Sequence, residues 1–441
     1  MLSSATSLKA LVIRGSAWTV AGHGVSQLIR LASSLILTRL LFPDAFGVMS
    51  LVWVVLYGLE MMSDVGLGPA IIRDKRGADP DFLNTAWTLQ VIRGAILWAA
   101  SCALAYPMAS VYGLPELARL IPAAGLSALI YGFGSTAWHA CRREMQFRRL
   151  VPLELLVQVI GFIATVLWAY LQPGVWALVG GSLIGSLAYA ITSHALLPGT
   201  RNRFRWESEA ARSLFGFGKW IFLSSAFTFL STQGDRLLLG RYVDMAQLGV
   251  YSIAVILSEA IQGLVIKIHH GVLFPAYGKV VREERERLAS VIGRARLAID
   301  VFVVLPVAAL TMFGSWVVNL LYDQRYHAAG WMLQVLCIRV LMVAVLVNSE
   351  SCLVVLGRPQ YSVVQNICRT IWILAGIPFG WTFFGLEGVV WVVALSEIPT
   401  VAVLWVGMAR HQLLSPWWEL RTVLFTGAGV LLGSALLHVM L

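Results

Sequence analysis

Long apolar runs separated by short polar segments make up almost the whole chain. A helix needs about 20 mostly apolar residues to cross a bilayer. Runs that meet this requirement lie at residues 15–41, 46–72, 85–111, 116–140, 150–171, 175–197, 213–239, 247–276, 297–321, 328–356, 360–383, 387–409 and 421–440. The pattern predicts an all-α polytopic membrane protein with about 13 spans.

Basic residues collect in every second connection between these runs. The basic connections are Arg73–Arg76, Cys141–Arg149, Arg201–Arg212, Lys279–Arg296, Gly357–Gln360 and Ala409–Gln412. Loops rich in Lys and Arg remain in the cytoplasm. We therefore expect a multi-pass protein of the cell inner (cytoplasmic) membrane, with its N-terminus in the cytoplasm and its C-terminus outside.

The composition supports a membrane protein and excludes several other classes. Hydrophobic residues make up 58% of the chain and charged residues only 13%, which is well below the fraction of charged residues in a soluble domain. The net charge of +10 comes from the basic loops, so nucleic acid is not an expected partner. The five cysteines form no CxxC pair, and no GxxxxGK[ST] motif occurs. We expect no metal, no cofactor and no ATP hydrolysis.

An internal repeat divides the predicted helices into two sets. Arg39 in LTRLLFPDAFGVMS matches Arg241 in LGRYVDMAQLGVYS, and Trp18 matches Trp220 at the same offset. This parallel repeat predicts two six-helix bundles around a central cavity, a common plan for transporters. The expected domains are 1–200, 201–411 and an extra C-terminal transmembrane helix at 412–441.

Several motifs resemble those of a known family of carriers. They are LTRLLFPDAFGVMS, DVGLGPAIIR (Asp64–Arg73), RREMQFRRL (Arg142–Leu150), GDRLLLGRY (Gly234–Tyr242) and LFPAYGKV (Leu273–Val280). Together they resemble the polysaccharide transporter (Wzx-type) oligosaccharide flippases. That family belongs to the multidrug/oligosaccharidyl-lipid/polysaccharide exporter superfamily. The thirteenth span departs from the usual twelve-span plan of that family.

The resemblance implies a carrier and not an enzyme. Its cargo would be an undecaprenyl-diphosphate-linked oligosaccharide repeat unit for O-antigen, capsule or exopolysaccharide synthesis. Alternating access coupled to H⁺ or Na⁺ would move this lipid-linked unit between leaflets. The implied partners are the lipid-linked oligosaccharide, membrane lipids and the proteins that assemble the polymer.

Ionisable residues inside the apolar runs are the candidate site residues. Such residues cost at least ~2.5–3.5 kcal/mol at the helix centre, so they usually face protein or water. Arginine suits a phosphate because its fork bonds two oxygens at once. The candidates for substrate binding are Arg30, Arg93, Lys267, His270, Arg339 and Arg369. The candidates for ion coupling are Asp64, Asp235 and Glu259.

Each of the three main clusters also has a purely structural interpretation. Arg30 and Asp64 would form an ion pair that holds two helices together. Lys267 would extend its side chain to the cytoplasmic headgroups. Arg236, next to Asp235, would anchor its helix at the outer interface.

Three other functions compete with a flippase. A drug or cation antiporter of the same superfamily would line its cavity with acids and aromatics, whereas this chain places several arginines in its helices. A membrane-embedded polysaccharide polymerase or glycosyltransferase would need a large outside loop, which the sequence lacks. A structural scaffold would not need so many buried charges.

Overall fold

The computed structural model describes residues 2–63, 67–199, 201–215, 218–269, 273–283 and 285–440. This part of the chain is almost entirely helical, as the hydropathy pattern predicts. It divides into two compact units, Met1–Phe229 and Leu230–Leu441. The three domains and the parallel repeat inferred from the sequence remain predictions.

Hydropathy and length identify the membrane-spanning helices. Ten helices in the described ranges are long and apolar enough to cross a membrane, and a bent helix pair brings the total to as many as 11. The runs 360–383 and 387–409 count once here as the stretch Gln360–Arg410, but the backbone leaves the helical conformation at Gly385, where φ is 61°. Trp372 Nε1 donates to the Val392 carbonyl at 2.9 Å, so the two runs fold back against each other. The protein is therefore a multi-pass membrane protein, and the number of 13 crossings remains a prediction.

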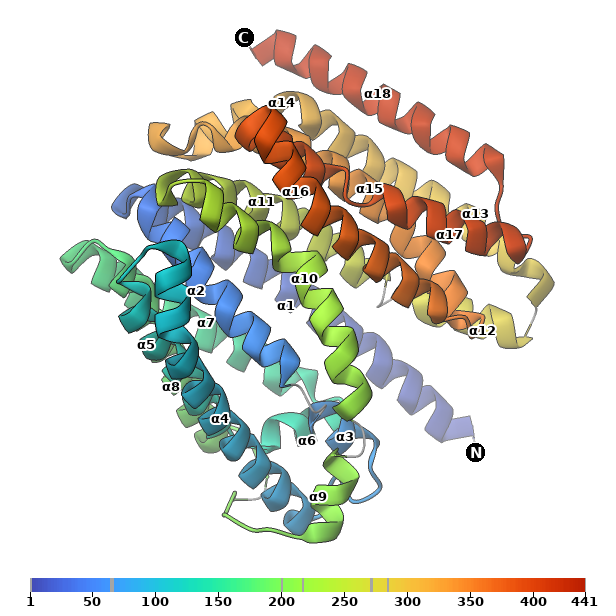
Figure 1. The fold of residues 1–441 in the computed structure, drawn as a ribbon. Helices are drawn as coiled ribbons and strands as arrows, with labels where there is room; N and C mark the ends of the chain where they lie inside the picture. Colours follow the sequence, from blue (N-terminus) through green and yellow to red (C-terminus); the bar gives the residue numbers. More distant parts are fainter. Residues whose placement is uncertain are drawn as a thin grey trace. The chain divides into compact units, whose positions relative to one another are not determined.

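The first unit is a bundle in which sequence neighbours pack side by side. Helix α4 lies against α5, α7 lies against α8, and α1 lies along α7 (Figure 1). The helices are α1 (Leu2–Leu40), α2 (Pro43–Met62), α3 (Leu67–Arg73), α4 (Pro80–Tyr112), α5 (Leu117–Gly132), α6 (Ala137–Arg143), α7 (Phe147–Leu171), α8 (Val175–Ala195), α9 (Ser208–Phe215) and the start of α10 (Gly218–Tyr242).

The run at 116–140 is not one straight helix. It breaks after Gly132, and α5 and α6 meet at an angle of 61°. A break inside a membrane helix frees backbone carbonyls that must find new donors. Gln90 of α4 supplies them, since its Nε2 donates to the carbonyls of Gly132 and Gly134 at 3.1 and 3.0 Å. Asn202 accepts from the Thr136 amide at 3.2 Å on the other side of the break.

The segment that follows α8 is fixed to the first turns of α4. Backbone amides of Arg203, Arg205 and Glu207 donate to the side chains of Asn84, Thr88 and Thr85 respectively. The Arg76 guanidinium forms two 2.8 Å bonds to the Glu207 carboxylate and lowers the pKa of that group.

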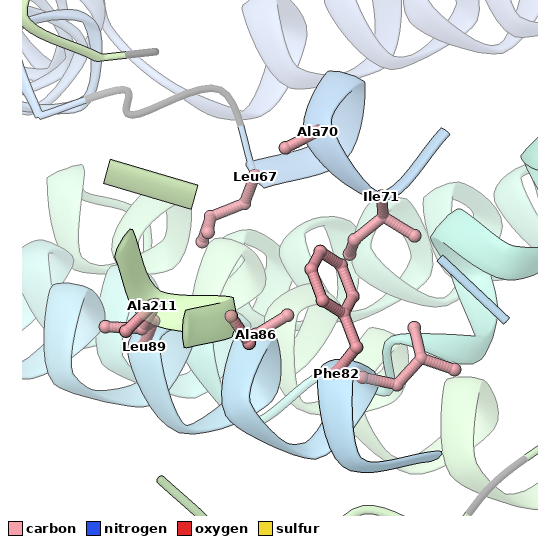
Figure 2. Packing of buried hydrophobic residues seen from close by; sticks show 9 residues of the cluster. Leu67, Ala70, Ile71, Phe82, Ala86, Leu89 and Ala211 are labelled. Atoms are coloured by element: carbon pink, nitrogen blue, oxygen red, sulfur yellow. The ribbon is translucent and has the colours of Figure 1, made fainter. Parts of the chain in front are cut away.

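An apolar cluster completes this attachment of α9 to the first unit. Figure 2 shows Ala211 of α9 beside Ala86 and Leu89 of α4, with Phe82 and Ile71 in the same cluster. All of these side chains are buried. Residues up to Phe215 therefore belong firmly to the first unit.

The second unit centres on α15, which packs against α11, α14, α16 and α17. Its further helices are α11 (Met245–Ile268), α12 (Phe274–Glu283), α13 (Leu288–Ile299), α14 (Leu305–Leu321), α15 (Ala329–Val355), α16 (Gln360–Ala394), α17 (Ile398–Arg410) and α18 (Pro416–Met440). A π-helical segment, Asp300–Val304, joins α13 to α14, and short 3₁₀ turns occur at Arg285–Arg287 and Gln324–Tyr326.

The extra C-terminal helix, α18, is bound tightly to α13 and α14. Asp300 is fully buried and accepts from Arg421 Nε and Thr422 Oγ1, both at 2.8 Å. Arg296, only 2% exposed, donates to Glu419 at 2.6 Å. These buried pairs fix the start of α18.

Small residues then bring the rest of α18 close to the backbone of α14. A Cβ added at Gly433 would lie 2.4 Å from the Ala309 carbonyl oxygen. Close approach through small residues is typical of helix pairs in membranes. The glycine contact and the ion pairs make α18 an integral part of the second unit.

We predict that Arg421→Ala lowers the thermal midpoint of the purified protein by about 5 °C or more. The reason is that the Asp300 carboxylate loses its counter-ion, and breaking a buried pair costs about 3–5 kcal/mol. Tryptophan fluorescence during heating in detergent measures the midpoint. Arg410→Ala, at an exposed position near the end of α17, is the matched control. Equal midpoints for the two variants would contradict the role assigned to the pair.

Candidate functional site

A cavity of the first unit lies among α1, α2, α5, α7 and α8. Its volume is about 910 Å³, and Arg30 lies in its wall. The Arg30 side chain is exposed and makes no ion pair with another described residue. The predicted partner in a structural pair, Asp64, lies outside the described residues. Arg30 therefore presents its charge to the cavity.

A second cavity of about 620 Å³ adjoins the first. The two cavities share five wall residues, namely Glu60, Leu97, Ala128, Tyr131 and Tyr189. The second cavity is lined by Arg93, Arg142 and His139. The first unit thus contains one hollow with two chambers, and arginines line both.

Arg93 is held in place by the end of α2. Its Nε donates to the carbonyl and hydroxyl oxygens of Ser63 at 3.0 and 3.1 Å, and its Nη2 donates to the Glu60 carbonyl at 3.0 Å. A cation is favourable there because the last carbonyls of a helix lack partners and carry partial negative charge. These bonds fix the guanidinium of Arg93 in the cavity wall and leave its Nη1 without a described protein partner.

Arg142 was not among the residues singled out from the sequence. It lies in α6 and is exposed in the wall of the second cavity. The sequence pattern assigns it to a basic loop, where arginine has a sufficient explanation in membrane topology. The bend between α5 and α6 places it beside the cavity, and the single helix predicted over 116–140 does not include that bend.

In the second unit, the two predicted arginines form ion pairs with one carboxylate. Arg369 Nη1 lies 3.0 Å from Glu397 Oε1, and Arg339 Nε lies 3.5 Å from the same atom. Glu397 is only 2% exposed. One buried carboxylate therefore serves two arginines, beside a cavity of about 420 Å³ that Glu350 also lines.

Asp235 and Glu259 lie in two neighbouring polar clusters of α10 and α11. Asp235 is 5% exposed, and its Oδ2 accepts from the Tyr251 hydroxyl at 2.5 Å. Its Oδ1 is buried without a hydrogen-bond partner among the described residues. Arg236 donates to Glu259 at 3.1 Å and to Gln233 at 2.6 Å, so it links two helices.

Of two further predicted residues, the structure describes only one. Lys267 is exposed on the last turn of α11. His270 lies outside the described residues, as Asp64 does. The structure therefore places Arg30 and Arg93 in adjoining cavities of the first unit, and it brings Arg339 and Arg369 together at Glu397 in the second.

The fold has close counterparts among solved transporters. An inward-facing multidrug resistance MATE family transporter of the MOP superfamily matches 91% of this chain and 96% of its own, with a TM-score of 0.66 and 16% identity. The lipid II flippase MurJ in an inward closed conformation matches 97% and 99%, with a TM-score of 0.71 and 12% identity. The chain is thus a multi-pass membrane protein with the fold of MOP-superfamily transporters.

The sequence comparisons define the family. The chain is 26% identical over 311 residues to the succinoglycan biosynthesis transport protein ExoT of Rhizobium meliloti, covering 69% of this chain and 60% of ExoT. It is 23% identical over 393 residues to the lipopolysaccharide biosynthesis protein WzxC of Escherichia coli, covering 87% and 78%. Residues 36–330 match the profile of the polysaccharide biosynthesis protein family, and the chain belongs to that family.

We predict that Glu397→Gln lowers the thermal midpoint and the yield of folded protein. The substitution leaves Arg339 and Arg369 facing each other in a buried site without a counter-charge, at a cost of about 3–5 kcal/mol. Size-exclusion chromatography and thermal unfolding in detergent measure the effect. Glu350→Gln removes a carboxylate from the same cavity that has no ion pair among the described residues, so it should behave as wild type. A Glu397→Gln protein as stable as Glu350→Gln would show that the shared carboxylate is dispensable.

Proposed function

We propose that the protein is a flippase that moves an undecaprenyl-diphosphate-linked oligosaccharide unit across the cell inner membrane, with its N-terminus in the cytoplasm. The unit would serve the synthesis of O-antigen, capsule or exopolysaccharide. The observation that carries the proposal is the two-chambered hollow of the first unit, lined by Arg30, Arg93 and Arg142. Its relatives named for succinoglycan and lipopolysaccharide biosynthesis support the cargo class.

The charge of the hollow favours an anionic cargo. Three arginines line the two chambers, against the two carboxylates Glu60 and Glu154. A diphosphate needs cations to replace its water, and arginine offers bidentate bonds to phosphate oxygens. A cavity for cationic drugs would have the opposite balance, so a flippase is favoured over a drug or cation antiporter.

The connections between helices favour a carrier over an enzyme. On the expected outer side, α1 ends at Leu40 and α2 begins at Pro43, while α7 ends at Leu171 and α8 begins at Val175. Such short connections cannot form the outside domain that a polymerase would need. The lipid tail of the cargo would remain in the bilayer, and polymer-assembly proteins would receive the flipped unit.

The second unit is proposed to supply ion coupling. A buried carboxylate oxygen without a partner, such as Asp235 Oδ1, is costly in a low-dielectric interior. Binding of H⁺ or Na⁺ from outside would relieve this cost and bias the carrier between its states. Glu259 of the second unit and Asp64 of the first unit are further candidates for this step. Lys267, His270, Arg339 and Arg369 remain predicted contributors to headgroup binding.

Arg30→Ala and Arg93→Ala should each reduce flipping about 10- to 100-fold. Each removes a charge-assisted bond worth about 1.5–3 kcal/mol. Vesicles that contain the purified protein and a fluorescent lipid-linked oligosaccharide measure leaflet exchange. Arg119→Ala, at an exposed position of the first unit outside both cavities, should flip as wild type. Normal flipping by both cavity variants would remove the proposed headgroup site.

Asp235→Asn should abolish the response of flipping to an ion gradient. The amide cannot take up a proton, and it carries no charge to bind Na⁺. Vesicles loaded to create a pH or Na⁺ gradient measure the rate with and without the gradient. Asp244→Asn, in the connection before α11, is the control and should keep the response. A gradient-dependent rate in Asp235→Asn would assign coupling to another group.

A further inference from the structure

The two chambers of the first unit differ in the chemistry of their walls. The smaller chamber is lined by the two arginines Arg93 and Arg142. The larger chamber is rich in aromatic rings, contributed by Trp53, Tyr57, Tyr131, Trp138, Phe162 and Tyr189. Cations suit a phosphate, whereas aromatic faces suit the C–H face of a sugar ring. The two halves of a sugar diphosphate therefore have complementary walls in this hollow.

Tyr131 lies at the junction, because it lines both chambers. Its side chain is 43% exposed. Its ring packs against Tyr189 at a centroid distance of 5.0 Å, and Tyr189 packs against the buried Trp138 at 5.2 Å. Pairs at these distances are favourable and restrict the rings. Tyr131 is therefore an exposed ring that packs against Tyr189, which in turn packs against Trp138.

Hydrogen-bonding groups line the same chambers as this exposed ring. Glu60 of α2 lines both chambers, and Glu154 and Gln158 of α7 line the larger one. Gln158 is oriented by a 3.0 Å bond from its Nε2 to the Ser26 carbonyl. Sugar hydroxyls both donate and accept, so carboxylates and amides beside an aromatic face match the edge of a pyranose ring. Specific sites generally combine an apolar wall with a few such polar groups.

We propose that Tyr131 is a stacking platform for the sugar nearest the diphosphate, while Arg93 and Arg142 hold the diphosphate itself. The proposal rests on the function proposed above and divides the headgroup between the two chambers. A headgroup bound in this way places the sugar in the aromatic chamber and the phosphates in the basic one. Recognition through a ring face tolerates different sugars and still requires that a sugar be present.

Binding to the full-length protein in nanodiscs tests the platform with two probes. One is undecaprenyl diphosphate, and the other is undecaprenyl diphosphate bearing one glucose residue. Tyr131→Leu should weaken binding of the glucose-bearing lipid about tenfold, the upper range for an aromatic contact. Its affinity for the sugar-free lipid should stay within about twofold of wild type, which also shows that the variant is folded. Tyr131→Phe keeps the ring and should bind both lipids as wild type does.

The outcomes separate the platform from the proposed function. Arg93→Ala should weaken binding of both lipids, because both carry the diphosphate. If Tyr131→Leu weakens both lipids equally, or neither, the platform is overturned while the flippase proposal stands. If the wild-type protein binds neither lipid, the flippase proposal fails and the platform fails with it.

Discussion

The free-energy cost of placing a charge in a low-dielectric interior determines where the charged side chains of this protein lie and which of them are paired. Several ionisable side chains within the described helices offset that cost by forming ion pairs. Asp300 is paired with Arg421, Arg296 with Glu419, and Glu397 with two arginines. Arg30 and Arg93, which form no such ion pair with a described residue, line cavities of the first unit. The distribution of pairing therefore distinguishes charges that hold the fold together from charges that are available to a ligand.

The charged side chains of the two units differ in their surroundings. The first unit exposes its arginines to a hollow, supported by the end of α2 and by the bend between α5 and α6. The second unit couples its arginines to acids and holds Asp235 nearly buried. In the proposed carrier, the unpaired arginines of the first unit would bind the headgroup and Asp235 of the second unit would bind the ion. Helix α18 belongs to the second unit, and its Arg421 and Glu419 form buried ion pairs that attach it to α13 and to Asp300.

Hydropathy predicted the helices because burial in lipid leaves a run of apolar residues in the sequence. It did not predict the break after Gly132, since the run at 116–140 is apolar enough to predict one membrane helix. The break depends on Gln90 and Asn202, which are remote in sequence and satisfy the freed backbone groups. Arg30 and Arg93 were found because a charge in an apolar run is conspicuous, whereas Arg142 was hidden in a basic loop. The pairing of Arg339 and Arg369 with Glu397 requires three helices to meet, which one sequence does not reveal.

Hydrogen–deuterium exchange tests the central claim most directly, namely that the hollow of the first unit binds the anionic headgroup. The protein in nanodiscs is compared with and without an undecaprenyl-diphosphate-linked oligosaccharide. The account predicts that the ligand slows exchange in the peptides around the α2 end and the α5–α6 bend, next to Arg93 and Arg142. The non-phosphorylated lipid undecaprenol should leave these peptides unchanged. Protection that appears only in the second unit, or equal protection by both lipids, would contradict the account.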